Sequence, residues 1–155
     1  MKNRDIKKIS EILSFEKFKF SKLSNETRIK LVRIQIVVDP ISEELGKARE
    51  KASKQFTTPR FEELNSKVAN HQLNIPSAEA DEYIKLSKEF NENMGKTLDP
   101  VFDEDRKIVF GKLTLEEYGK VIDANEDWLT GDMPKTLFMH IVDDKPEKEP
   151  KKKEE

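Results

Sequence analysis

The clearest pattern of hydrophobic and polar positions lies between residues 31 and 52. Apolar residues recur there at alternating intervals of three and four, which places them on one face of an α-helix. We therefore predict one long helix from about Asn25 to Gln55, with Ser24 as its N-cap and Glu26 in its first turn. The apolar residues of this stripe, which we expect to lie in the core, are Leu31, Ile34, Val38, Ile41, Leu45, Ala48 and Ala52.

Pro40 lies in the middle of this predicted helix. A proline inside a helix removes the hydrogen bond to the carbonyl four residues earlier, which here belongs to Ile36. Because the apolar stripe keeps its phase on both sides of Pro40, we expect a single kinked helix. The alternative is two helices broken at Asp39–Pro40, with Asp39 capping the second, since the residue before a proline is biased out of the helical region.

A short amphipathic helix is predicted before the long one, beginning near Asn3 or Asp5; its apolar residues are Ile6, Ile9, Ile12 and Leu13.

The link between these two helices interleaves phenylalanines with lysines. Phe15, Phe18 and Phe20 are separated by Lys17 and Lys19. Such a pattern can form a stacking platform for single-stranded nucleic acid. More often the phenylalanines anchor the core while the lysines reach water, and we interpret them as core residues.

Two further helices are predicted after the long one. The first would begin with Pro59 in its first helical position and extend to about Gln72; because the segment is otherwise polar, the alternative is that part of it is a loop. The second is capped by Ser77, and Gly95 together with Asp99–Pro100 predicts its end. Because two long apolar stripes are separated by a connection, we expect an antiparallel helical hairpin. The stripe of the later helix consists of Ala80, Tyr83, Leu86, Phe90 and Met94.

The last third of the chain changes character. Two short apolar runs, Val101–Phe102 and Ile108–Phe110, flank five charged residues and predict a β-hairpin. Thr114 and Glu117 then have the spacing of a capping box, which predicts a helix to about Ala124. The apolar residues between Trp128 and Val142 are expected to fold back as a short strand or a turn of helix.

The fold class predicted from these elements is mainly α with a small β element (α+β). It combines a long kinked helix in an antiparallel helical hairpin with a C-terminal β-hairpin and a short helix. Residues 1–142 are expected to form a single domain. Residues 143–155 contain only Lys, Glu, Asp and Pro, and we expect them to form a disordered charged tail.

Composition narrows the class of protein. The chain has no cysteine, which excludes disulfides, thiolate metal sites and cysteine nucleophiles and suits a reducing cytoplasm. Its longest apolar run, Ile36–Val38, is far shorter than the roughly 20 residues of a membrane span. The charged first residues contain no apolar segment typical of a signal peptide. We therefore expect a cytoplasmic protein without a membrane segment.

Charge is distributed unevenly along the chain. Residues 1–33 contain ten basic and four acidic residues, a net charge of +6 within a total of -2. Such asymmetry can mark a nucleic-acid-binding arm. Because the basic residues are dispersed rather than consecutive, we favour attraction between parts of the fold, or simple solvation.

No catalytic signature is found. The chain lacks glycine-rich phosphate-binding loops, the hydrolase nucleophile elbow and the zinc-protease motif. His71 and His140 are far apart and neither has a ligand partner at metal-binding spacing. The cluster Asp103–Asp105 lacks the calcium-loop pattern, and a polar hairpin tip explains it equally well. We predict a protein that is not an enzyme and that has no cofactor and no metal.

The order of the predicted parts supports a family resemblance. A short N-terminal helix and the turn 20–24 precede a long helix with a proline followed by acidic residues, Pro40–Leu45. A helix containing Tyr83–Phe90 and the segment Leu113–Tyr118 follow. Over residues 4–125 or so this arrangement resembles a group of small uncharacterised proteins encoded by phages and prophages, among virion-structural (head–tail and tail-assembly) genes. The resemblance implies an accessory role in particle morphogenesis and supplies no catalytic residues.

The functional expectation is a non-enzymatic protein–protein interaction module that acts in phage or prophage virion assembly. Its partners would be virion structural subunits, or a second copy of the chain, bound through the exposed parts of the helical hairpin and the acidic segment near Asp103. The alternative is a nucleic-acid-associated protein that uses the basic N-terminal third, although a pI near 5.9 argues against strong non-specific binding.

Overall fold

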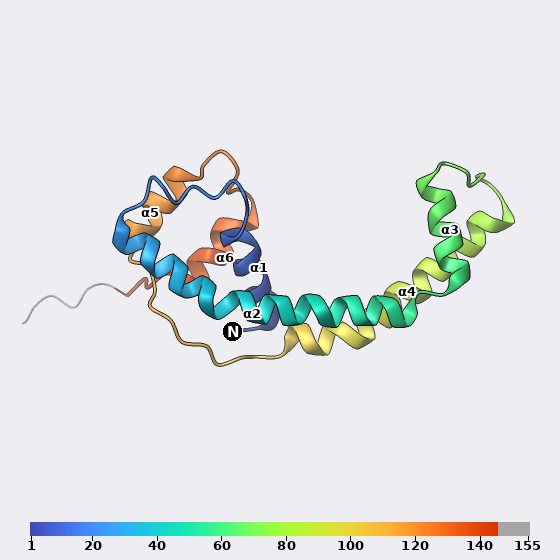
Figure 1. Ribbon diagram of the computed structural model, residues 1–155, viewed down its shortest axis with the longest axis horizontal. Coiled ribbons are helices and arrows are strands. Elements are labelled where there is room, and N and C mark those ends of the chain that lie inside the picture. Colours follow the sequence, from blue (N-terminus) through green and yellow to red (C-terminus); the bar gives the residue numbers. More distant parts are fainter. Residues whose placement is uncertain (146–155) are drawn as a thin grey trace, which may run out of the picture. The chain divides into compact units, whose positions relative to one another are not determined.

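The computed structural model describes residues 1–145, and every regular element in that range is a helix (Figure 1). The helices are α1 (Asn3–Leu13), α2 (Asn25–Phe56), α3 (Pro59–Ala69), α4 (Ala78–Asp103), α5 (Leu115–Ala124) and α6 (Asp132–Ile141). The β-type pairing among the described residues consists of two isolated bridges, Lys2 with Asp105 and Leu113 with Val142.

The prediction of a C-terminal β-hairpin, and with it the α+β fold class, is wrong. Val101 and Phe102 belong to the last turn of α4, which continues past Pro100 to Asp103. Residues near the N-terminus of the chain donate hydrogen bonds to carbonyl groups at the end of this helix. Asn3 donates its backbone N–H to the Glu104 carbonyl (3.0 Å) and its side-chain amide to the Val101 carbonyl (2.7 Å). These bonds replace the hydrogen-bonding partners that a second strand would have offered.

Helix α2 runs through Pro40 without interruption, so the alternative of two helices broken at Asp39–Pro40 is wrong. Asp39 does not cap a new helix; its carboxylate accepts a hydrogen bond from the Ser10 hydroxyl (2.7 Å). The kink at Pro40 stays a prediction. Of the seven stripe residues, Leu31, Ile34, Val38, Leu45 and Ala52 are buried, and Ile41 and Ala48 are half-buried.

The chain forms two compact units that share α1 and α2. Unit 1 consists of Met1, Lys8–Asp39 and the chain from Lys107 onward, and unit 2 consists of Lys2–Lys7 and Pro40–Arg106. Residues 143–145 of the predicted tail are described, and the Asp143 N–H donates to the Leu113 carbonyl (2.8 Å). The rest of that tail prediction, residues 146–155, lies outside the described residues.

Unit 1 packs α5 and α6 against α1 and the first half of α2 (Figure 1). The Tyr118 hydroxyl in α5 donates to the Pro134 carbonyl in α6 (2.6 Å). The segment before α5 is hydrogen-bonded to the end of α6, because the Leu113 N–H donates to the Ile141 carbonyl (2.8 Å). The segment between Trp128 and Val142, expected to form a short strand or a turn of helix, contains a ten-residue helix, α6.

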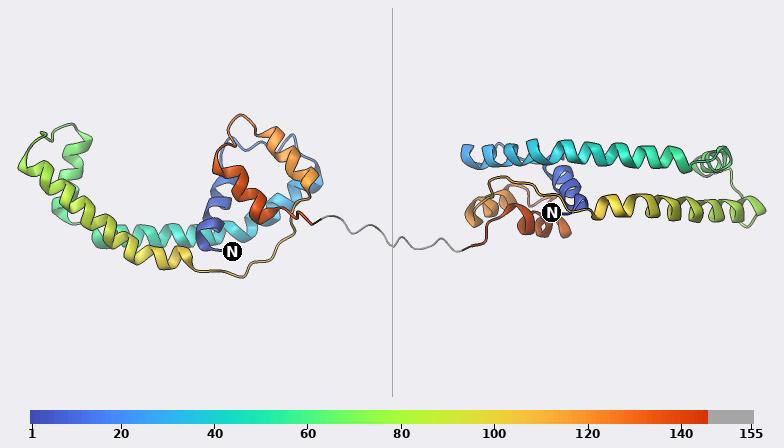
Figure 2. Two further views of the ribbon diagram at one scale, coloured as in Figure 1. Left: turned by 180° about the vertical axis from the view of Figure 1, so that it is seen from behind. Right: turned by 90° about the horizontal axis from the view of Figure 1, so that it is seen from below.

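Unit 2 is built on two helices that run in opposite directions. Figure 2 shows α4 lying along the second half of α2, with the short helix α3 between them in sequence. Arg106 reinforces this pairing, since its guanidinium donates to both carboxylate oxygens of Glu44 (2.7 and 3.1 Å). No helix of residues 1–145 is long and apolar enough for a membrane crossing.

Candidate functional site

Helix α4 carries an apolar stripe that is longer than the sequence pattern predicted. Beyond Phe90 and Met94 it continues with Leu98 and Phe102, each four residues after the last. All four of these side chains are half-buried, so none is fully covered by the rest of the chain. A helix face that is apolar but only partly covered is a feature that requires an explanation.

Helix α3 covers only the first part of this stripe. Phe61, which is buried, stacks on Tyr83 with ring centroids 6.0 Å apart and contacts Phe90 at 5.2 Å. The stripe from Met94 onward lies beyond these aromatic contacts.

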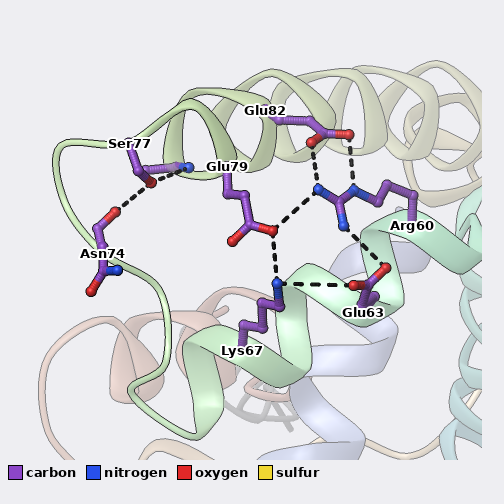
Figure 3. A network of polar contacts seen from close by, with 8 residues as sticks. Arg60, Glu63, Lys67, Asn74, Ser77, Glu79 and Glu82 are labelled. Atoms are coloured by element: carbon purple, nitrogen blue, oxygen red, sulfur yellow. Dashed lines mark hydrogen bonds and ion pairs between the residues drawn. The ribbon is translucent and has the colours of Figure 1, made fainter.

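A network of ion pairs holds α3 on α4 (Figure 3). Arg60 donates to both carboxylate oxygens of Glu82 (3.0 and 2.8 Å), and the Lys67 ammonium donates to Glu79 (2.7 Å). Arg60 also pairs with Glu63 of its own helix (3.1 Å). Hydrogen bonds from these cations lower the pKa of the Glu79 and Glu82 carboxyls. Because the charges match across the two helices, the pairing has one favoured register.

The connection between α3 and α4 is held by local hydrogen bonds. The Ser77 hydroxyl accepts from the Ala80 N–H (3.1 Å) and donates to the Asn74 carbonyl (2.6 Å), as Figure 3 shows. The peptide bond between Ile75 and Pro76 is cis. The N-cap of α4 is therefore the predicted residue, Ser77.

Beyond α3 the stripe lines an open groove of about 300 Å³. The residues around it are Arg49 from α2 and Phe90, Asn91, Met94, Gly95, Leu98, Asp99 and Phe102 from α4. A smaller cavity of about 80 Å³ shares Phe90 and lies at the beginning of α3. The larger of the two, which we call the α4 groove, is the candidate functional site.

Two opposite charges border the α4 groove. Arg49 lies on the α2 side and Asp99 on the α4 side, and neither has an ion-pair partner among residues 1–145. Gly95 leaves the wall between them open, because a Cβ there would meet only an Asp99 carboxylate oxygen at 3.6 Å. The groove thus offers an apolar surface flanked by one positive and one negative group.

The acidic segment that the sequence suggested as a second contact region is occupied by internal interactions. Asp103 forms ion pairs with Lys2 (3.8 Å) and Arg4. The backbone of Asp105 forms an isolated β-bridge with that of Lys2. Within the described part of the chain, no group of three or more His, Cys, Asp or Glu side chains could hold a metal ion. His71 lies in unit 2 and His140 in unit 1.

The Thr114–Glu117 capping box is present and has a tertiary role as well. The Thr114 hydroxyl accepts from the Glu117 N–H (3.1 Å), and the Glu117 carboxylate accepts from the Thr114 N–H (2.8 Å). The Lys30 ammonium donates to both oxygens of that carboxylate (2.8 Å each). The box therefore attaches α5 to α2 in addition to starting α5.

Sequence reasoning missed Arg49, Gly95, Leu98 and Phe102 as site residues. The signal for the last two was present, because the interval of four residues from Phe90 continues through them. Gly95 and Asp99–Pro100, however, are local signals for the end of a helix, and they hide this continuation of the stripe beyond Met94. Arg49 carried no signal, since its place beside α4 depends on how two distant helices pack.

No protein-family model, curated protein or solved structure matches this chain. The α4 groove is therefore the observation from which a function can be inferred.

Proposed function

We propose that this protein is an interaction module that holds an amphipathic helix of a protein partner in the α4 groove. The observation that carries the proposal is the half-buried run Phe90, Met94, Leu98 and Phe102 along an open groove of about 300 Å³. From Phe90 to Phe102 this run spans ~18 Å, which is about three turns of a docked helix. Helix-in-groove binding uses an apolar strip of this kind.

Helix α3 indicates what the partner helix would look like. Within unit 2, α3 is a short amphipathic helix that already binds the neighbouring part of the same α4 face. It does so with one buried aromatic residue, Phe61, and with two cations, Arg60 and Lys67, that pair with α4 carboxylates. By the same logic, a partner helix would carry an apolar ridge, an acidic residue for Arg49 and a basic residue for Asp99.

The cellular role that we propose is an accessory one in virion assembly, with a virion structural subunit as the partner. The resemblance to phage and prophage proteins supports this role, whereas the groove supports protein binding in general. No catalytic step is part of the proposal.

We do not propose nucleic-acid binding, because several residues of the basic N-terminal third are paired with carboxylates. Lys19 forms an ion pair with Asp127 (2.9 Å), and Lys30 pairs with Glu117 (2.8 Å). Lys2 and Arg4 pair with Asp103. Cations that are already neutralised have less to gain from phosphate groups.

The test is to block the groove with Gly95→Gln. Glutamine favours a helix over glycine by up to ~1 kcal/mol, so the variant should fold at least as well as the parent. Its side chain would occupy the space between Arg49 and Asp99. Gly119→Gln is the matched control, because Gly119 is an exposed helical glycine of α5 with open space around it.

Tagged parent and variants would be used to isolate partners from the native host, and a partner so identified would be purified and titrated by calorimetry. We expect Gly95→Gln to weaken binding at least roughly tenfold, which corresponds to ~1.4 kcal/mol, and Gly119→Gln to leave it unchanged. Equal affinity of the parent and Gly95→Gln for that partner would exclude the α4 groove as its binding site.

A further inference from the structure

Unit 1 contains a cavity that is separate from the α4 groove and shares no residue with it. Its volume is about 410 Å³. Ile12, Phe15, Trp128 and Met133 form its apolar wall, and Lys8, Lys17 and Glu11 complete its lining. This volume lies within the range of cavities that bind small organic molecules in proteins.

Trp128 is fixed in this wall before any ligand arrives. Its indole N–H donates to the Asn125 side-chain oxygen (3.0 Å), which also accepts from the Lys19 backbone N–H (2.8 Å). Asn125 is fully buried, and its amide donates to the Val121 carbonyl (2.9 Å). Because the indole N–H already has an acceptor, a ligand would contact the apolar ring of Trp128 rather than its polar group.

Phe15 is the exposed counterpart of this fixed ring. Its centroid lies 4.8 Å from that of Trp128, and 42% of its surface is exposed. The neighbouring Phe18, by contrast, is buried and contacts Trp128 from 5.9 Å. Two aromatic rings thus line an open cavity, and one of them, Phe15, is exposed to water.

The charges of the lining favour an anion. Two lysines and one glutamate give a net charge of +1. Lys17 lies near Asp127, whose pKa is lowered mainly by a hydrogen bond from Lys19 and to a smaller extent by Lys17. Lys8 has no ion-pair partner among residues 1–145. Lys8 is therefore the lining cation that is available to a ligand.

We propose that this cavity is a binding site for a small aromatic compound with a single negative charge. The rings of the compound would lie against Phe15 and Trp128, and its anionic group would approach the Lys8 ammonium. Binding of this kind is independent of the proposed function in unit 2.

The site has a built-in reporter, because Trp128 is the only tryptophan of the chain. The probe is anilinonaphthalene sulfonate, a monoanion with aromatic rings, titrated into the full chain. We expect saturable quenching of Trp128 emission together with energy transfer to the probe. Phenylnaphthylamine, a neutral compound with the same ring system, should bind more weakly by roughly fivefold, because it lacks the charge that pairs with Lys8.

Three variants locate the probe. Lys8→Gln should weaken sulfonate binding by roughly fivefold and leave binding of the neutral compound unchanged. Phe15→Ala should weaken the binding of both compounds. Lys22→Gln removes an exposed lysine that lies between α1 and α2 and outside the cavity lining, and it should leave the binding of both compounds unchanged.

Three results would overturn the proposal. They are the absence of saturable quenching at millimolar probe, equal affinity for the charged and neutral compounds, and binding that is insensitive to Phe15→Ala. The second result would identify an apolar surface without preference for anions. The third would place the probe elsewhere on the chain.

Discussion

His71 follows α3 in a backbone conformation that is unusual for a residue with a side chain. Its φ is 54°, in the left-handed region that glycine adopts without steric cost. The residue closes α3: its N–H donates to the Val68 carbonyl (3.1 Å), and the Gln72 N–H donates to the Lys67 carbonyl (2.7 Å). This is the bonding pattern of a Schellman motif, with histidine where glycine is usual.

We therefore expect His71→Gly to raise the free energy of unfolding by about 0.5–1 kcal/mol, since relief of the left-handed strain exceeds the entropy that glycine adds to the unfolded chain. Urea denaturation measures the change. Gln72→Gly is the control, because Gln72 has no positive φ and should lose stability instead. A less stable His71→Gly protein would mean that the imidazole makes a stabilising contribution larger than the strain.

At the scale of elements, the attachment of α5 to α2 depends on one carboxylate. Burial of Glu117 acts to raise its pKa, but hydrogen bonds from Lys30 and from the Thr114 backbone outweigh burial, and the pKa is lowered. The pKa of Lys30 is raised, first of all by its hydrogen bond to Glu117. Both shifts indicate that the folded state favours the charged forms of this pair.

A carboxyl whose pKa is lowered on folding adds stability above its unfolded pKa of about 4.3, and that stability is lost as the pH falls through the folded value. We expect Glu117→Gln to lower the free energy of unfolding by about 1 kcal/mol at pH 7, because glutamine keeps the capping bond but not the ion pair. The difference should shrink on acidification. Urea titrations between about pH 5 and pH 3 measure it, and a constant difference across that range would contradict the assignment.

At the scale of the molecule, the two units share two helices. Both α1 and α2 pass from one unit to the other, and the buried stripe of α2 continues from Val38 in unit 1 to Leu45 in unit 2. Because a helix is stabilised cooperatively along its length, loss of one unit should weaken the other. The prediction of a single domain for residues 1–142 therefore means that the two units should unfold together.

The position of the only tryptophan allows a direct test, since Trp128 belongs to unit 1 whereas helical circular dichroism reports on both units. We expect the two signals to change together in urea. Leu45→Ala, a substitution in unit 2 expected to cost about 2–5 kcal/mol, should move the fluorescence midpoint as far as the dichroism midpoint. A fluorescence midpoint that is unchanged by Leu45→Ala would show that the two units unfold independently.

Local signals account for the elements that could be predicted. The phase of the α2 stripe, the Ser77 cap and the Thr114–Glu117 box each depend on residues within a few positions of one another, and each is found in the structure. The same reasoning predicts that α4 ends at Gly95 and Asp99–Pro100, whereas the helix continues to Asp103. That prediction failed because Asn3, about one hundred residues away in the sequence, supplies hydrogen bonds to the carbonyls of Val101 and Glu104.

Where most helices begin and which of their faces are apolar follows from the amino-acid order alone, because spacing and capping are properties of neighbouring residues. Which apolar faces stay open depends on how distant helices pack. Phe90 to Phe102 has the same pattern as a core stripe, and α3 is too short to cover it. Phe15 and Phe18 were both expected in the core, yet Phe15 is exposed beside Trp128. The coverage of a side chain depends on distant segments, which no local pattern contains.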